Sequence, residues 1–155
     1  MTRRQKYFSI LAMAGMFTIP IHAESAMNPA GQQLQGTWLM KLTLPGQPPA
    51  PQLATYNSDG SLLASAPGGA TQHGVWVRIG DRSFAATIYG YRYDDKGVFA
   101  GMIKIRAALQ LSDTLDRLDG TAEADVLDPD GNVLISFGGI TFTQKRIGVE
   151  TKEQQ

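Results

Sequence analysis

Turn signals divide the chain from Gly36 onward into short runs that are apolar or alternate between apolar and polar residues. The main signals are Asn57-Ser58-Asp59-Gly60, Gly80-Asp81-Arg82, Tyr93-Asp94-Asp95-Lys96-Gly97, Ser112-Asp113 and Asp128-Pro129-Asp130-Gly131-Asn132. Asp, Asn and Gly supply the local hydrogen bonds and the positive φ that tight hairpins need. The spacing predicts antiparallel strands that each pair with the next. A meander of about eight strands without covering helices must close or leave unpaired edges, so we expect an all-β, eight-stranded antiparallel up-and-down barrel.

The expected strands follow from the runs between these turns. They are Gly36–Leu44, Gln52–Asn57, Ser61–Ala66, Gln72–Ile79, Ser83–Tyr93, Val98–Leu111, Arg117–Leu127 and Val133–Ile147. The later runs are longer than the usual five or six residues, as the tilted strands of a barrel require. The proline-rich segment Pro45–Pro51 is predicted to be a stiff connection over one mouth of the barrel. A two-sheet sandwich is the structural alternative, but long crossover connections are not evident.

The N-terminal residues have the pattern of a signal peptide. Arg3, Arg4 and Lys6 precede an apolar run over residues 7–21, and Ala23 ends a small-residue exit, so we expect cleavage after Ala23. The apolar run is shorter than the roughly 20 residues of a spanning helix, which makes an uncleaved anchor the weaker alternative. We therefore expect a periplasmic or secreted protein that is not embedded in a membrane after cleavage. The expected segments are signal peptide 1–23, lead-in 24–35, barrel 36–147 and flexible tail 148–155.

Composition narrows the classes of partner. The chain has 14 Lys and Arg against 14 Asp and Glu, and removal of Arg3, Arg4 and Lys6 leaves 11 against 14, a net charge of −3. Proteins that bind nucleic acid need a basic face, so we expect no nucleic-acid partner. The chain contains no cysteine, so the stability of an exported domain must come from packing and backbone pairing.

Small residues occupy many strand positions where a dense core would need bulk. Ala122 and Ala124 alternate with charged residues, and Gly138 and Gly139 lie in the middle of a strand. Further examples are Ala85, Ala86, Gly90, Ala100, Gly101, Ala107 and Ala108. An interior lined by such residues leaves empty volume, which is costly and favours a ligand cavity. The alternative is that the glycines allow bends and that larger partners fill the gaps.

The run Val98–Leu111 has one apolar face and one face with two cations, Lys104 and Arg106. If the apolar face points inward, these cations are solvated surface charges. If the register is reversed, they enter the cavity and can bind a carboxylate, with Arg106 as a bidentate fork. The candidate ligand-binding residues are Tyr89, Tyr91, Met102, Lys104, Arg106 and His73, and the expected ligand is a small apolar or acidic molecule.

Two short motifs resemble a known family. Gly36-Thr37-Trp38 opens the first strand and Lys145-Arg146 ends the last one, which is similar to the lipocalin and wider calycin pattern. The run from Thr55 to Gly60 and the later His73-Gly74-Val75-Trp76 resemble bacterial lipocalin-like proteins. The resemblance implies a barrel that Gly36, Trp38 and Arg146 close at one end, with the guanidinium over the indole.

No catalytic or metal-binding motif is recognisable. Asp128–Asn132 has the acidic spacing of a calcium loop but no later Glu or flanking helices, so it is predicted to be a hairpin turn. No cofactor and no metal are expected. The leading hypothesis is an exported barrel that binds a small hydrophobic or amphipathic molecule in its interior. The alternatives are a cyclase or isomerase that acts by confinement, using groups such as His73 or Tyr89, and a protein-interaction module with a filled interior.

Overall fold

The computed structural model of the chain describes residues 33–150 and forms one closed sheet of eight strands. The strands are β1 (Gly36–Thr43), β2 (Ala50–Tyr56), β3 (Ser61–Ser65), β4 (Gln72–Arg78), β5 (Ser83–Tyr93), β6 (Phe99–Leu111), β7 (Arg117–Leu127) and β8 (Val133–Arg146). The expected signal peptide and most of the lead-in lie outside the described residues. Within residues 33–150, no helix is long and apolar enough to cross a membrane.

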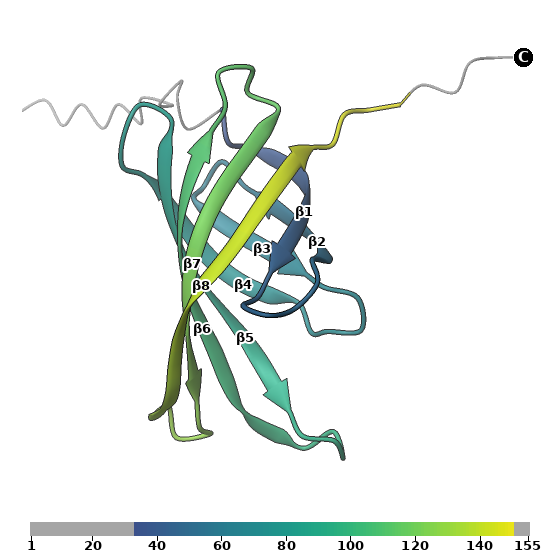
Figure 1. Cartoon of the computed structure of the whole chain (residues 1–155), viewed down its shortest axis with the longest axis vertical. Coiled ribbons are helices and arrows are strands. Elements are labelled where there is room, and N and C mark those ends of the chain that lie inside the picture. Colours follow the sequence, from purple (N-terminus) through teal and green to yellow (C-terminus); the bar gives the residue numbers. More distant parts are fainter. Residues whose placement is uncertain (1–32, 151–155) are drawn as a thin grey trace, which may run out of the picture.

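Each strand pairs antiparallel with the next one along the chain, and β8 returns to pair with β1. The register of this closing pair runs from Trp38 opposite Arg146 to Thr43 opposite Thr141. The predicted all-β, up-and-down eight-stranded barrel is therefore confirmed, and the sandwich alternative is excluded. The architecture is consistent with a calycin-like fold (Figure 1).

The predicted turn residues at Asp94 and Asp128 form two hairpin turns with the same pattern of hydrogen bonds to an aspartate side chain. Asp94 accepts hydrogen bonds from the backbone N–H groups of Lys96 and Val98, at 2.9 and 2.8 Å. Asp128 does the same for Asp130 and Asn132, at 3.0 and 2.8 Å. The glycine that ends each turn has a positive φ, which side-chain-bearing residues adopt at a cost. The prediction that residues 128–132 form a hairpin turn is thus confirmed.

The proline-rich connection is shorter than predicted, because β2 begins at Ala50. Pro51 pairs with Lys41 of β1, whereas the pairing of β2 with β3 begins only at Leu53. Pro51 therefore lies in a part of β2 that has a neighbour on one side only. Proline is tolerated there because its missing N–H group costs no ladder hydrogen bond. The prediction that the entire segment to Pro51 is a connection was wrong.

The barrel is asymmetric, because the strands of its second half are longer than those of its first. The strands β5–β8 have 11, 13, 11 and 14 residues, against 5 to 8 in β1–β4. The excess length continues beyond β1–β4 as two hairpins, β5–β6 and β7–β8 (Figure 1). In β8 the pairing with β1 begins only at Thr141, so residues 133–140 pair with β7 alone. At this end of the barrel, the edge of β8 that faces β1 and the edge of β5 that faces β4 therefore have no neighbouring strand within the described residues.

The other end of the barrel holds the largest fully buried side chains. Trp38, Phe84, Leu111 and Leu118 are each at most 1% exposed, and Leu34 from the preceding turn is equally buried. Trp76 lies edge-on to Phe84, with ring centroids 5.8 Å apart. The packed core therefore fills one end of the barrel and leaves the middle and the extended end to smaller side chains.

Candidate functional site

The candidate site is a cavity in the middle of the barrel, and all eight strands contribute to its lining. The lining residues are Met40, Leu42, Gln52, Ala54, Tyr56, Leu62, Ala64, Gln72, Ala86, Ile88, Ile105, Ala107, Leu109, Ala122, Phe142 and Gln144. Ala86, Ala107 and Ala122 pair with one another across β5, β6 and β7, so they form a row of methyl groups on the inner wall. The prediction that small residues line the interior holds for these strands.

The cavity is narrow. It holds about 440 Å3 of space free of protein atoms, part of which opens to solvent, and the centre of a water molecule can reach about 30 Å3 of it. On the second measure one water needs about 10–15 Å3, so the enclosed part has room for roughly two waters. A ligand larger than this has to displace side chains. The unbranched thioether chain of Met40 is the most adaptable member of the lining.

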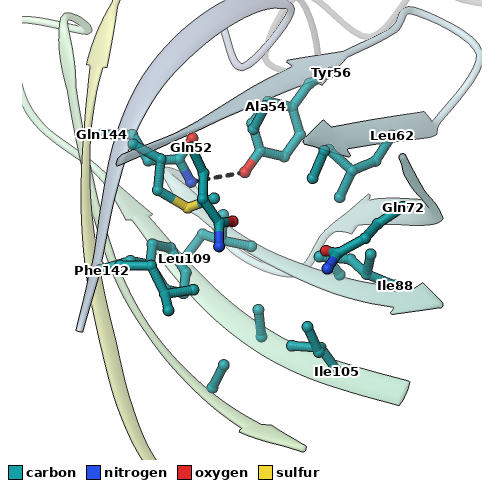
Figure 2. Close-up of a pocket in the computed structure, with 16 residues that line it drawn as sticks. Gln52, Ala54, Tyr56, Leu62, Gln72, Ile88, Ile105, Leu109, Phe142 and Gln144 are labelled. Carbon is teal, nitrogen blue, oxygen red and sulfur yellow. Dashed lines mark hydrogen bonds between the residues drawn. The ribbon is translucent and has the colours of Figure 1, made fainter. Parts of the chain in front are cut away.

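The lining is apolar except for four side chains, two of which form a buried pair. Gln144 donates a hydrogen bond through Nε2 to the hydroxyl of Tyr56 at 2.9 Å, and the two residues are 2% and 3% exposed. Figure 2 shows this pair at one side of the cavity, with the amides of Gln52 and Gln72 extending into the cavity from other strands. Burial raises the pKa of Tyr56 well above its ordinary value, so the hydroxyl keeps its proton.

Gln144 has an unsatisfied group. Its Oε1 atom is buried and accepts no hydrogen bond from the residues that the structure describes. Rotation of the amide by half a turn would exchange the two atoms and leave Nε2 without a partner instead. A buried amide group without a partner costs free energy, so the site has a hydrogen-bonding capacity that the protein itself does not use.

The closed end of the barrel has the contact that the family resemblance implies. The guanidinium of Arg146 lies 4.2 Å from the centre of the Trp38 ring, and the indole N–H donates to the carbonyl of Leu34 at 3.0 Å. Gly36 has φ +119°, and a Cβ placed there would lie 3.3 Å from Nη1 of Arg146. A glycine at this position lets the guanidinium approach the backbone without strain.

Arg146 also ties the closing strand to two other segments. Its Nε donates to the carbonyl of Leu115 at 2.9 Å, and its two terminal nitrogens donate to the carbonyls of Gln35 and Gln33. Leu115 has a positive φ of 62°, which is uncommon for a leucine. The turn before β7 and the entry to β1 are thus both held by one side chain. The cavity is covered at this end.

The opposite end of the cavity is bordered by apolar side chains that are only partly buried. Leu42, Leu44, Ile103 and Phe137 contact the core there, and Ile135 farther along β8 is 57% exposed. Ile103, Phe137 and Ile135 lie on the inner face of the extended hairpins, since they alternate with outward-facing neighbours, whereas Leu42 lies at the end of β1 and Leu44 just beyond it. An apolar surface therefore continues from the cavity wall into the open end.

The sequence-predicted ligand residues come together, but on the outside of the barrel. Tyr89 pairs with both His73 and Lys104, and Tyr91 pairs with Met102. Their neighbours along the strands, such as Ile88 and Ile105, line the cavity instead. The apolar face of β6 is inward, so Lys104 and Arg106 do not enter the interior. None of the six candidates contributes to the cavity lining.

The cations on the outer face of β6 have partners on the neighbouring strand. Arg106 binds Asp125 of β7 through two hydrogen bonds, at 2.5 and 3.3 Å, and Ser136 of β8 donates to the same carboxylate at 2.7 Å. Lys104 lies directly opposite Asp125 and over the ring of Tyr89, 5.9 Å from its centre. The outer face of the sheet thereby pairs its charges.

The ion pair predicts a specific acid response. The Arg106 guanidinium, followed by the Ser136 hydroxyl, lowers the pKa of Asp125 from 3.8 to about 2. A carboxyl with a depressed pKa stabilises the fold above its unfolded pKa, and this contribution is lost as the pH falls from 3.8 toward 2. We expect Asp125→Asn to be less stable at pH 7 and to lose less stability than the wild type between pH 4 and pH 2, as measured by urea unfolding.

Glu123→Gln is the matched control for this prediction. Glu123 lies on the same face of β7 but 3.9 Å from Arg106, and its side chain is 74% exposed. Exposed pairs contribute little, so its stability curve should run parallel to that of the wild type. An Asp125→Asn variant with the full acid slope of the wild type would show that other carboxyl groups cause the response.

The sequence contained a signal for the cavity residues that the candidate list missed. Gln144 follows Ile140 and Phe142 at the same alternate positions of β8, so a polar residue stands on an otherwise apolar face. Tyr56 stands in the same relation to Ala54 in β2. The missed residues could have been found by asking which polar side chains share a face with buried ones.

Comparison of the sequence with known protein families and with curated proteins finds no match. The site must therefore be interpreted from its own chemistry. Among residues 33–150 its lining contains no charged residue, and the one ionisable group that these residues place in it, Tyr56, keeps its proton. Such a lining can bind an apolar molecule and form a few neutral hydrogen bonds.

Proposed function

We propose that this protein binds one small hydrophobic or amphipathic molecule inside the barrel. The molecule enters at the extended end, where the β5–β6 and β7–β8 hairpins continue beyond β1–β4. The observation that carries the proposal is a cavity whose wall contains a row of alanines and an unsatisfied, buried amide. A barrel whose only task was stability would gain by filling this space, because empty volume in a core is destabilising. The bacterial lipocalin-like assignment, the export of the chain and its periplasmic or secreted location belong to the same proposal.

Two features support entry from one end. Trp38 and Arg146 cover the other end, where the large side chains are buried. At the extended end the cavity wall continues into partly buried apolar side chains, which a ligand chain can cover. Burial of apolar ligand surface against them stabilises a complex by about 25 cal/mol per Å2.

The test is to fill the cavity with a larger side chain. Ala107→Leu replaces a methyl group with an isobutyl group in the middle of the alanine row, and we expect it to weaken binding of 1-octanol by at least about tenfold, because the larger side chain occupies the site. Binding is followed by NMR of protein labelled at the alanine methyl carbons. Five alanines line the cavity, namely Ala54, Ala64, Ala86, Ala107 and Ala122, so their shifts report occupancy directly.

Ala108→Leu is the matched control. Ala108 is the next residue of β6 and lies on the outer face, opposite Ala85 and Thr121. The same substitution there should leave octanol binding unchanged. If Ala107→Leu unfolds the barrel, Ala122→Val provides a smaller increase at the same level. Equal affinity in the inward and outward variants, or no methyl shift with the wild type, would reject interior binding.

The confinement enzyme finds less support. The interior presents Tyr56 and three amides, and a tyrosine whose pKa is raised is a poor general base. An interaction module is supported by the exposed aromatic residues on the outer face, of which Tyr91 and Phe99 lie edge-on at 5.9 Å. The same NMR titration separates these functions, because an interaction module should show no interior shifts.

A further inference from the structure

The polar pair in the cavity specifies the chemistry of the ligand more closely. On the basis of the proposed function, we propose that the bound molecule is a slender apolar chain with a neutral hydroxyl or N–H group at one end. This group would donate a hydrogen bond to Oε1 of Gln144 and accept one from the hydroxyl of Tyr56. A long-chain alcohol or primary amide has this chemistry.

Gln144 and Tyr56 have hydrogen-bonding groups that the described residues do not use. Gln144 uses one N–H group on the oxygen of Tyr56, and its Oε1 remains unsatisfied within the described part of the chain. The Tyr56 hydroxyl accepts this bond, and no acceptor for its own hydrogen is recorded among residues 33–150. The pair therefore presents one acceptor, Oε1, and two donors, the hydroxyl of Tyr56 and the second N–H of Gln144. A ligand hydroxyl donates to the acceptor and accepts from one of the donors.

The charge of the cavity lining favours a neutral ligand over an anionic one. The sixteen lining residues include no Lys, Arg or His, and Lys104 and Arg106 lie on the outer face. An ionised carboxylate would enter this wall without a counter-charge and at a large desolvation cost. An acidic ligand, which the sequence suggested, is therefore disfavoured relative to a neutral one. The hydroxyl of Tyr56 stays protonated and available as a donor.

The position of the polar pair and the shape of the cavity determine how a ligand can lie. Tyr56 lies edge-on to Trp76, with centroids 6.3 Å apart, and Trp76 in turn contacts Phe84 at the packed end of the barrel. The polar pair is thus at the deep side of the cavity, and the alanine row and Ile105 lie between it and the open end. A molecule whose head reaches the pair must extend its tail along this wall. The narrow space favours a single chain over fused rings.

The experiment compares isomers that differ in one donor. 1-Octanol and methyl heptyl ether have the same atoms, but the ether cannot donate a hydrogen bond. We expect the wild-type protein to bind the alcohol about five- to tenfold more tightly, because only the alcohol satisfies Oε1 of Gln144. Octanoate, the third probe, should bind more weakly than both. Nuclear Overhauser contacts should place the hydroxyl-bearing carbon near the Tyr56 ring and the tail methyl near Ile105.

Two variants locate the preference. Gln144→Met keeps an unbranched side chain without the amide, so it should reduce the ratio of alcohol to ether affinity to about one, with ether binding retained. Tyr56→Phe removes a donor from which the alcohol and the ether can both accept, so it should weaken both and leave the ratio near the wild-type value. Gln72→Met is the matched control. It removes another lining amide, one that is nearer the open end and forms no part of the pair, so the ratio should stay at the wild-type value.

The outcomes distinguish the two proposals. If none of the three probes shifts the alanine methyls, interior binding itself is wrong. If alcohol and ether bind equally to the wild type, or if Gln144→Met keeps the wild-type ratio, interior binding stands and the inference about the head group is wrong. Either of these last two results would mean that a buried water already donates the hydrogen bond to Oε1 of Gln144. Should Gln144→Met fail to fold, Gln144→Leu, which also lacks the amide, gives the same test.

Discussion

Replacing Trp38 with alanine should lower the free energy of unfolding by about 3–5 kcal/mol. The side chain is 0% exposed and lies between the entry to β1 and the guanidinium of Arg146. Its removal leaves a cavity at the end of the barrel that holds the largest buried side chains. Because domains of this size have only about 5–15 kcal/mol in total, the variant should unfold at a much lower urea concentration. Unfolding is followed by far-ultraviolet circular dichroism, and by the fluorescence of Trp76.

Leu39→Ala is the control for this substitution. Leu39 is the next residue of β1, faces outward and is 47% exposed, so the loss should be below about 1 kcal/mol. Similar losses at the inward and outward positions would show that the closed end is not a cooperative core. The comparison uses the alternation of a single strand, so both residues pair with β2 and β8 and differ in the face to which they point.

The pairing of Trp38 with Arg146 is tested separately by a double-mutant cycle. We expect a coupling of about 0.5–2 kcal/mol between Trp38→Leu and Arg146→Met, since the guanidinium lies over the ring at 4.2 Å. Loss of Arg146 also leaves three backbone carbonyls without their donor, which the cycle cancels. Additive losses would mean that the arginine acts through those carbonyls alone.

The barrel could be predicted from the sequence because its turns are local. The hairpins at Asp94 and Asp128 are determined by side-chain hydrogen bonds within four residues, so the strand ends next to them were predicted within one residue. The expected bounds of β5 and β7 match the structure. Pro51 was assigned to the connection because proline does not fit a central strand, whereas it is tolerated in a part of a strand that is unpaired on one side.

The residues that line the cavity differ from the sequence candidates for a physical reason. Tyr89, Lys104 and Arg106 were selected by residue type, and their chemistry is used on the outer face, where Asp125 neutralises Arg106. Which face of β6 points inward depends on its pairing with β7, a non-local property. The pair of Tyr56 and Gln144 joins residues 88 positions apart, and no spacing rule brings them together. Only the closure of β8 on β1 does so.

Gly101→Ala should be nearly as destabilising as the loss of Trp38, by about 2–5 kcal/mol. Gly101 has φ +115°, and a Cβ there would lie 2.0 Å from the carbonyl oxygen of Leu127. The beginning of β6 therefore approaches the end of β7 more closely than any side chain permits. Separation of these strands would splay the two extended hairpins and expose the apolar wall of the cavity. We expect faster amide exchange in β6 near Gly101 and weaker octanol binding, in addition to the lower stability.

Substitutions at two other glycines separate the backbone strain from the steric clash of the added Cβ. Gly46→Ala has a positive φ of 72° and no atom within 4 Å of the added Cβ, so it measures backbone strain alone, about 1–2 kcal/mol. Gly138→Ala meets only the side chain of Glu123 at an ordinary 3.6 Å and should change stability by less than about 1 kcal/mol. A loss at Gly101 no larger than that at Gly46 would show that β6 and β7 can move apart without cost. In that case the open end would not be shaped by this contact, and the cavity wall would owe its position to the alanine row instead.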